Sequence, residues 1–180
     1  MERLLASEWH EERIFALLIL VRRFERGEAA ERERIFRFYL AHLRRVNNWD
    51  LVDLSALSIV GEHLAGKSLA PLRRLVRSRV LWERRVAIVA TFAFLRRGRV
   101  QPTFELTRVL LDDPEELLHK AAGWALREAG KRDTGALRAF LARYAAVMPR
   151  TMLRYAIERL PPNERLKWLG KIPIERLLDQ

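Results

Sequence analysis

The sequence predicts an all-α protein, a right-handed helical solenoid of two-helix repeats. Leucine, alanine, arginine and glutamate dominate its 180 residues, and only eight glycines and seven prolines interrupt them. No stretch alternates apolar and polar residues as a half-buried strand does. Similar short segments also recur at nearly constant spacing. Together these three observations favour stacked helices over a sheet or a mixed fold.

Helix-starting and helix-ending residues divide the chain into ten expected helices. Starts are indicated by Asn47 with Asp50 three residues later, by Asp113-Pro114, by Asp133-Thr134 and by Pro149 at a first helical position. Glycines that can end a helix stand at Gly27, Gly61, Gly66, Gly98 and Gly130. The expected helices lie near residues 8–26, 29–44, 48–64, 69–78, 81–97, 103–112, 115–130, 134–147, 150–160 and 164–169.

A repeat underlies these helices. Equivalent positions recur about every 35 residues, at Ala16, Val52, Ala87, Ala122 and Ala156. The surrounding text is similar too, as in Glu83-Arg-Arg-Val-Ala87 and His119-Lys-Ala-Ala122. A period of this size with two helices per unit is typical of a HEAT-like solenoid, here of about five units. The marked helices are apolar nearly all round, so they are expected to form the inner, buried layer.

The charge of the chain favours a phosphate-bearing partner. Formal net charge is +11 and the pI is about 11.0, and arginine binds phosphate through two parallel hydrogen bonds. The longest apolar stretch, Ile14 to Val21, is too short to cross a bilayer, so no membrane partner is expected. The absence of cysteine excludes disulfides and thiolate catalysis. The N-terminal residues lack a signal-peptide layout, which predicts a cytoplasmic protein.

Charged and aromatic residues occupy the opening turns of the inner helices. In chain order they are Arg13, then Trp49, Asp50 and Asp53, then Arg84 and Arg85, then His119, Lys120 and Trp124, then Arg150 and Arg154. Equivalent positions of successive repeats line up along one edge of a solenoid, so these turns are expected to form a continuous basic groove. Such a groove suits a phosphate backbone. The expected phosphate contacts come from Arg84, Arg85, Lys120, Arg150 and Arg154.

Asp53 is the main candidate for chemistry. It follows Trp49 by one helical turn, which places a carboxylate and an indole on one face of a helix. A carboxylate repels nucleic acid, so a basic protein that presents one beside an aromatic ring has a use for it, namely to stabilise a cation forming on the nucleic acid. The simpler interpretation is a carboxylate that only interacts with the helix dipole. Asp50 is assigned such a structural role, as a capping residue.

The tryptophans and basic residues near Asp53 also allow two interpretations. Trp49 and Trp124 each fit either core packing or ligand contact, and their place in neighbouring inner helices favours contact. Arg85 and Lys120 hold the same repeat position, and either phosphate contact or a solvated charge remains open. The other tryptophans are assigned to packing: Trp9, Trp82 and Trp168. The four histidines have no metal-ligand spacing, and no phosphate loop or dinucleotide motif occurs, so no metal and no cofactor is expected.

Four segments, in order, match a known family. They are Asn48-Trp-Asp-Leu-Val-Asp53, Leu81-Trp-Glu-Arg-Arg-Val-Ala-Ile88, His119-Lys-Ala-Ala-Gly-Trp-Ala-Leu-Arg-Glu128 and Met148-Pro-Arg-Thr-Met-Leu-Arg-Tyr-Ala-Ile157. They resemble the AlkD-like DNA alkylation repair family of HEAT-like-repeat DNA glycosylases. The resemblance covers residues 1–169 of an expected single domain of residues 1–180, with residues 170–180 as a C-terminal tail. Family members usually begin with further helices that contribute an aromatic residue near the lesion, so this sequence is expected to be either a shortened member or one whose N-terminal part is missing.

The resemblance implies a monofunctional glycosylase that removes cationic N3- and N7-alkylated purines from double-stranded DNA. Asp53 then corresponds to the catalytic carboxylate. Trp49 and Trp124 correspond to the aromatic pair that packs on the deoxyribose of the lesion, and Arg85 to the residue that holds the neighbouring phosphate. The family is understood to act without drawing the lesion into a base pocket, unlike most glycosylases. A monomer, nucleoid-associated when bound to DNA, is expected.

Two other functions fit the same sequence. A non-catalytic nucleic-acid-binding repeat protein predicts salt-sensitive binding without release of a base. A protein–protein scaffold, the role of many HEAT-like arrays, leaves the basic edge unexplained.

Overall fold

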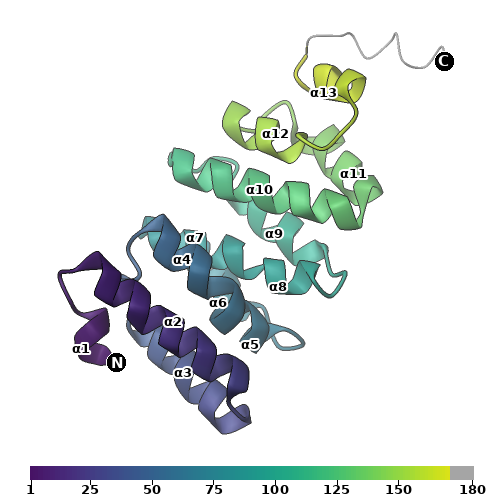
Figure 1. Ribbon diagram of the computed structural model, residues 1–180. Coiled ribbons are helices and arrows are strands. Elements are labelled where there is room, and N and C mark those ends of the chain that lie inside the picture. Colours follow the sequence, from purple (N-terminus) through teal and green to yellow (C-terminus); the bar gives the residue numbers. More distant parts are fainter. Residues whose placement is uncertain (171–180) are drawn as a thin grey trace.

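The computed structural model describes residues 1–170, all helices and turns without a strand in that range (Figure 1). The tail expected at residues 170–180 lies, from residue 171 on, outside the described part. The N-terminal half contains α1 (Glu2–Leu5), α2 (His10–Arg26), α3 (Ala29–Ala41), the 3-10 turn η1 (Leu43–Arg45), α4 (Trp49–Ala56), the π-helical turn η2 (Leu57–Gly61), α5 (Glu62–Leu64) and α6 (Ala70–Leu75). The second half contains α7 (Leu81–Ala90), α8 (Phe92–Leu95), α9 (Gln101–Val109), α10 (Glu116–Arg132), α11 (Thr134–Tyr144), α12 (Arg150–Ala156) and α13 (Pro162–Trp168).

All ten expected helices are confirmed, and two of them are interrupted. The helix expected at 48–64 continues from α4 through the π turn η2 into α5, and such turns widen the backbone locally. The helix expected at 81–97 breaks at Thr91, whose buried hydroxyl donates to the Ile88 carbonyl at 2.7 Å. A threonine that bonds its own helix in this way bends it. The single turn α1 was not predicted.

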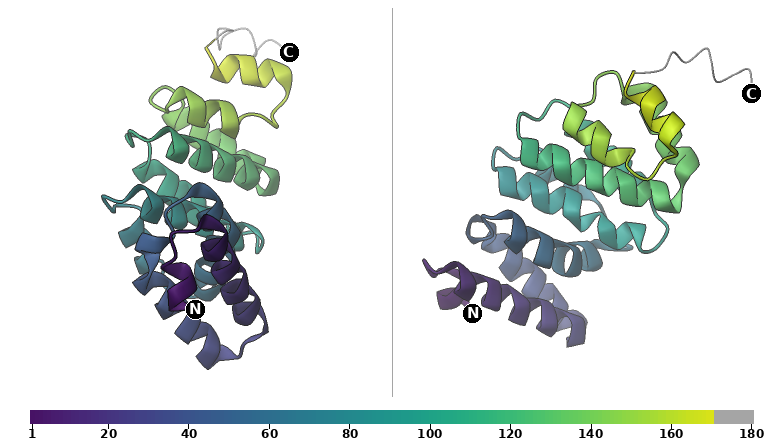
Figure 2. Two further views of the ribbon diagram at one scale, coloured as in Figure 1. Left: turned by 60° about the vertical axis from the view of Figure 1, so that its left-hand side comes forward. Right: turned by 45° about the horizontal axis from the view of Figure 1, so that its top comes forward.

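The helices stack in two layers, as a solenoid requires. In one layer, α2 contacts α4, α4 contacts α7, α7 contacts α10 and α10 contacts α12, and the successive helices follow one another along the molecule (Figures 1 and 2). Among the second helices of the repeats, α3 contacts α2, α6 contacts α7, and α9 and α11 contact α10. This arrangement confirms the predicted helical solenoid.

The repeat alignment also holds at the level of single side chains. The five aligned residues, one in each repeat, are at most 1% exposed: Ala16, Val52, Ala87, Ala122 and Ala156. Small residues at these positions let neighbouring helices approach closely. One hydrophobic cluster extends from Leu5 to Leu160 through all the repeats, so each repeat buries its apolar face against the next.

Two glycines mark the closest approaches between the stacked helices. A Cβ atom on Gly61 would lie 2.4 Å from the carbonyl oxygen of Ala90, and one on Gly123 would lie 2.5 Å from that of Met152. Backbone atoms cannot move aside as a flexible side chain can, so both positions require glycine. At Gly123 this brings α12 directly against α10.

Two of the three tryptophans assigned to packing do pack, and the third does not. Trp82 and Trp168 are half-buried against the hydrophobic core. Trp9 is 71% exposed, so its assignment was wrong. It precedes α2 as an N-cap residue in extended conformation, and its backbone N–H donates to the Ser7 hydroxyl at 3.1 Å. None of the helices in the described range is both long and apolar enough to cross a membrane.

Candidate functional site

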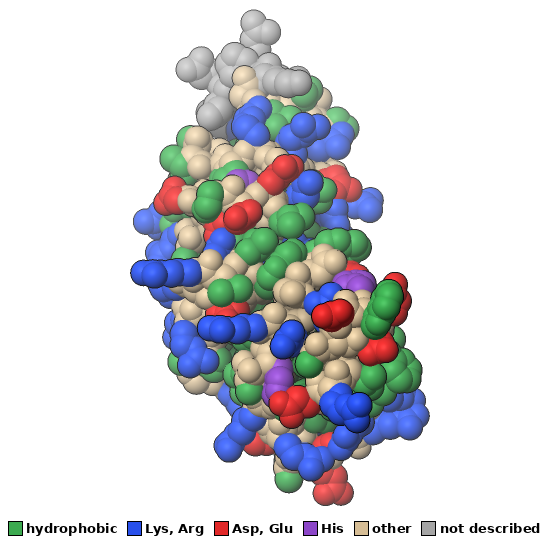
Figure 3. All heavy atoms as spheres, turned by 90° about the vertical axis from the view of Figure 1, so that its left-hand side faces the viewer, with side chains coloured by type: hydrophobic (Ala, Val, Ile, Leu, Met, Phe, Trp, Pro, Cys, Tyr) green, Lys and Arg blue, Asp and Glu red, His purple; other side chains and the backbone are tan. Residues whose placement is uncertain are grey.

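The opening turns of the stacked helices lie on one side of the molecule. In Figure 1, α2, α4, α10 and α12 all begin on the left. Figure 3 shows that side, where hydrophobic side chains gather near the middle and basic side chains border them. The expected alignment of the opening turns is therefore present. Trp49 and Arg84 lie in the first turns of α4 and α7, but Trp124 lies in the middle of α10, so its expected place in an opening turn was wrong.

Helix α4 begins at Trp49 and carries both Trp49 and Asp53. Asn48 is its N-cap, and the Asn48 side chain accepts a hydrogen bond from the Trp49 backbone N–H at 2.8 Å. This cap lies one residue after the Asn47 expected from the sequence. Trp49 stays 54% exposed, and the Asp53 side chain, one turn further on, keeps 21% of its surface exposed. The helix thus presents an indole and a carboxylate on adjacent turns.

The first turn of α2 holds the start of α4 in place. His10 Nε2 lies 2.6 Å from Asp50 Oδ2, and Arg13 Nη1 donates to Asn47 Oδ1 at 2.7 Å. Asp50 also accepts a hydrogen bond from the Leu51 backbone N–H through Oδ1, at 2.8 Å. Asp50 therefore links α2 to α4 as well as capping its own helix. The role of His10 was not predicted, because the two residues are 40 positions apart.

A buried tyrosine supports α4 from its other side. The Tyr39 hydroxyl of α3 lies 2.9 Å from Ser55 Oγ, and Ser55 donates to the Leu51 carbonyl at 2.5 Å. Burial raises the pKa of Tyr39 well above its ordinary value, and the negative charge of Asp53 adds to the rise. Tyr39 is therefore neutral at physiological pH and serves as a fixed hydrogen-bonding group behind the carboxylate helix.

Arg85 holds the carboxylate of Asp53 with two hydrogen bonds. Its Nε donates to Asp53 Oδ1 at 2.9 Å and its Nη2 to Asp53 Oδ2 at 2.7 Å. Its Nη1 donates to the Leu117 carbonyl at the start of α10, at 2.9 Å. The Arg85 side chain is only 7% exposed. This two-point geometry fixes the orientation of the carboxylate and spans three consecutive repeats.

An open cleft of about 340 Å³ adjoins this ion pair, lined by Trp49, Arg85, Leu117, Lys120, Ala121, Trp124, Arg127 and Tyr155. Trp124 is half-buried, and its ring packs on Phe92 with centroids 4.4 Å apart and planes tilted by 50°. Three aromatic side chains therefore face one space together with Arg85, Lys120 and Arg127. The structure brings both predicted tryptophans to the cleft that Arg85, the partner of Asp53, also lines.

The other predicted phosphate-binding residues differ in how available they are. Arg84 is almost buried, and its Nε lies 2.6 Å from Asp113 Oδ2. The Arg84 side chain is 12% exposed and the Asp113 side chain 6%. Lys120 is 43% exposed and 3.3 Å from Glu116 Oε1. Arg154 is exposed, and Arg150 is exposed with one hydrogen bond to the Leu169 carbonyl at 3.2 Å. The predicted continuous basic groove is thus broken at α7, where Arg84 and Arg85 both pair with carboxylates.

Sequence reasoning missed Tyr155 and Arg127 as lining residues. Tyr155 stands inside the matched segment of α12, but nothing in its local pattern separates it from a packing residue. Arg127 is one helical turn after Trp124, so helical spacing alone places it on the same face. Arg127 pairs with Glu158, two residues after the end of α12, and its Nε lies 3.4 Å from Glu128 Oε1.

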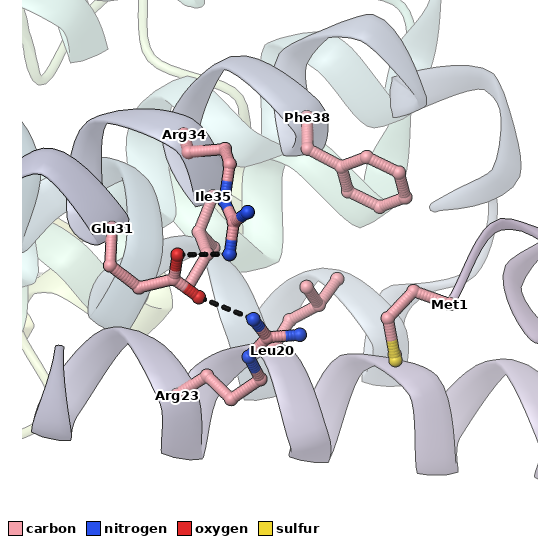
Figure 4. A pocket seen from close by; sticks show the side chains of 7 residues that line it. All are labelled: Met1, Leu20, Arg23, Glu31, Arg34, Ile35 and Phe38. Atoms are coloured by element: carbon pink, nitrogen blue, oxygen red, sulfur yellow. Dashed lines mark hydrogen bonds and ion pairs between the residues drawn. The ribbon is translucent and has the colours of Figure 1, made fainter.

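A second hollow lies between α2 and α3, with a volume of about 280 Å³ (Figure 4). Its acid, Glu31, accepts from Arg23 at 2.6 Å and also from Arg34. Leu20, Ile35 and other apolar residues form the rest of its wall. All three charged groups of this hollow are thus bound to one another. No group of three His, Asp or Glu residues in the described range is arranged to hold a metal ion.

Comparison with known proteins identifies a family. The model of the family described as DNA alkylation repair enzyme matches residues 1–160, a range that includes the cleft and all four matched segments. The match ends before the boundary at 169 that the resemblance suggested. A search of the curated proteins finds no match. The match gives the chain a role in DNA repair. This chain therefore belongs to the DNA alkylation repair enzyme family.

Proposed function

We propose that the protein is a monofunctional DNA glycosylase that hydrolyses the N-glycosidic bond of cationic N3- and N7-alkylated purines in double-stranded DNA. The observation that carries the proposal is the bidentate contact of Arg85 with Asp53 beside the cleft of Trp49 and Trp124. This part of the protein combines a carboxylate in a fixed orientation, aromatic rings that line a cleft, and basic side chains around them. A general DNA-binding surface has no need for the carboxylate.

The chemistry of the substrate explains why so few groups suffice. An N3- or N7-alkylated purine is positively charged while attached to the sugar and leaves as a neutral base, so no general acid is required. The remaining barrier is the positive charge that develops on the deoxyribose as the bond breaks. A carboxylate near the sugar stabilises that charge and orients the attacking water. Asp53 is the candidate for both tasks.

The two indoles supply the second part of the site. Trp49 and Trp124 present ring faces that attract a developing cation, an interaction worth about 1–2 kcal/mol for each ring when water is excluded. Trp124 is braced by Phe92, so little side-chain freedom is lost when a sugar packs on it. Trp49 is more exposed, and substrate contact would cover the apolar surface that it leaves to solvent.

Arg85 is proposed to act in two ways. Its three hydrogen bonds to Asp53 and Leu117 make it a positioning residue for the carboxylate. A guanidinium has five N–H groups, so two remain for the phosphate contact implied by the family resemblance. Lys120, Arg150 and Arg154 are proposed as further phosphate contacts, because they are half-exposed or exposed. Arg84 would have to leave Asp113 to take part.

One observation favours a second candidate function, a DNA-binding protein that does not excise bases. The guanidinium of Arg85 partly neutralises Asp53 and so weakens the field available to a sugar cation. A base-release assay separates the two candidates. Purified protein is incubated with duplex DNA carrying 7-methylguanine, and released base is measured by chromatography. Release above the uncatalysed rate supports the glycosylase, whereas salt-sensitive binding without release supports the second candidate.

A further inference from the structure

Tyr155 is an aromatic residue in the cleft to which neither the family match nor the proposed chemistry gives a role. It lies on α12, the next stacked helix after the one that carries Trp124. Gly123 brings it there, since a Cβ atom on Gly123 would lie 2.6 Å from Tyr155 Cβ. With no side chain at position 123, α12 packs against α10 immediately beside Trp124. Tyr155 thereby extends the aromatic wall of the cleft by one repeat.

The fold itself makes little use of the Tyr155 side chain. Its neighbours Leu153 and Ala156 are 0% and 1% exposed and belong to the core, whereas Tyr155 is 37% exposed. Within residues 1–170 the Tyr155 hydroxyl forms no hydrogen bond, whereas the hydroxyl of the buried Tyr39 is hydrogen-bonded to Ser55. An exposed tyrosine whose hydroxyl donor is unused within the described residues is typical of a contact surface.

The surroundings of Tyr155 indicate what it contacts. Arg154 is its exposed neighbour in sequence, and Lys120 and Arg127 line the same cleft. Arg127 is paired with Glu158, so its charge is partly offset. Arg154 and Lys120, beside a phenol hydroxyl and an aromatic wall, match the alternation of phosphate and sugar along a DNA strand.

We propose that Tyr155 contacts the sugar–phosphate backbone of a nucleotide that flanks the lesion, with its ring against a deoxyribose and its hydroxyl donating to a phosphate oxygen. The proposal rests on the proposed function, because it takes the nucleotide at Asp53 as the lesion. Tyr155 lines the cleft, whereas Asp53 does not, and α7 and α10 stand between the helices that carry the two residues. Tyr155 therefore contributes to affinity for the duplex and not to breaking the bond.

The test is single-turnover release of 7-methylguanine from duplex DNA at increasing protein concentration, for the wild type, Tyr155→Phe and Tyr155→Ala. We expect the half-saturating concentration to rise about 3–10-fold in Tyr155→Phe, the effect of one lost hydrogen bond, and further in Tyr155→Ala. The maximal rate stays within about twofold. Tyr144→Phe, on α11 and packed on Phe140, is the matched control and leaves both quantities unchanged.

Binding to an unmodified duplex provides a readout that needs no excision. Both Tyr155 variants should bind it more weakly than the wild type, with an unchanged slope of log affinity against log salt, since tyrosine carries no charge to release counterions. Wild-type affinity in both variants would overturn the proposal, as would a lower maximal rate at unchanged half-saturation. If the wild type releases no base but Tyr155→Phe still weakens binding, the glycosylase proposal fails and the backbone contact stands. Thermal unfolding of both variants identifies any loss of folding.

Discussion

Arg85 binds both carboxylate oxygens of Asp53, at 2.9 and 2.7 Å, although the two residues belong to different repeats and are separated by 32 positions in sequence. The pair joins α4 to α7, and the third hydrogen bond of Arg85 continues the link to α10. One guanidinium on α7 thus ties together α4, which carries Trp49 and Asp53, and α10, which carries Trp124. Most of the expected properties of the site depend on this contact.

Replacing Asp53 by Asn should abolish most base release while duplex binding persists. Asparagine keeps the shape of the side chain but removes the negative charge that faces the sugar, and loss of one preorganised electrostatic group commonly costs about 10²–10³-fold in rate. Binding should be equal or stronger, because a charge that repels phosphate is gone. Single-turnover rates and duplex affinity are measured together. Glu25→Gln on α2 is the control, because it makes the same change of charge at a position distant from Asp53 in the chain. Normal base release by Asp53→Asn would refute the assignment of Asp53 as the catalytic carboxylate.

Replacing Arg85 tests whether it binds phosphate or only positions Asp53. Arg85→Ala leaves a carboxylate without its buried partner, so we expect a loss of about 3–5 kcal/mol in unfolding free energy. Arg85→Lys keeps the positive charge but cannot bind both carboxylate oxygens of Asp53 in the same geometry. It should therefore be more stable than Arg85→Ala but release base more slowly than the wild type. If Arg85 also binds phosphate, the salt dependence of duplex binding for the alanine variant falls by about one unit of slope. An unchanged slope restricts Arg85 to positioning.

Trp49 and Trp9 form a matched pair for testing the aromatic contact. Both are exposed tryptophans at the start of stacked helices, at 54% and 71% exposure, but only Trp49 lines the cleft. Trp49→Ala should lower the rate of base release about tenfold, the equivalent of one cation–π contact. Trp9→Ala should leave it unchanged. Equal rates for the two variants would remove Trp49 from the site.

Gly123 is expected to tolerate no side chain. In Gly123→Ala the new methyl group meets the Met152 carbonyl oxygen at 2.5 Å, and overpacking of this kind costs about 1–3 kcal/mol or more. Because α12 must move away from α10, Tyr155 should also leave its place beside Trp124. Gly135→Ala is the control, since its nearest contact would be the Asp133 side chain at 3.4 Å. Urea unfolding of both variants gives the comparison, and equal stability would contradict the close approach.

His63 should make the protein less stable in mild acid. Burial lowers the pKa of His63, which stacks on Phe36 with ring centroids 3.9 Å apart, and the charge of Lys67 lowers it further. His63 is therefore harder to protonate in the folded protein than in the unfolded chain, where it has the ordinary histidine pKa of about 6.5. The contribution of neutral His63 to the unfolding free energy is complete above that pH. It is lost as the pH falls toward the lower pKa that His63 has in the folded protein. Unfolding free energies of the wild type and His63→Gln, compared at about pH 7.5 and about pH 5.5, should show a smaller decrease for the variant.

The sequence was sufficient to predict the solenoid, because its signals are local and repeated. Helix periodicity, caps and the spacing of Ala16, Val52, Ala87, Ala122 and Ala156 all lie within short windows or recur at a fixed period. The same regularity located Trp49, Asp53 and Trp124 on stacked helices, although Trp124 lies in the middle of α10 and not in its opening turn. The assignment of catalytic and phosphate-binding roles to these residues remains a prediction.

Only the tertiary structure decided how the charged groups pair. Arg84 and Arg85 looked alike in sequence, yet each is almost buried against its own carboxylate, Asp113 or Asp53. Ion pairing depends on distances of a few ångströms between residues about one repeat apart. Helical periodicity locates a side chain only to within one residue, which corresponds to a rotation of about 100° around the helix axis, so it cannot predict such distances. The exposure of Trp9 and the entry of Tyr155 into the cleft have the same origin, because both depend on which neighbouring helix covers them.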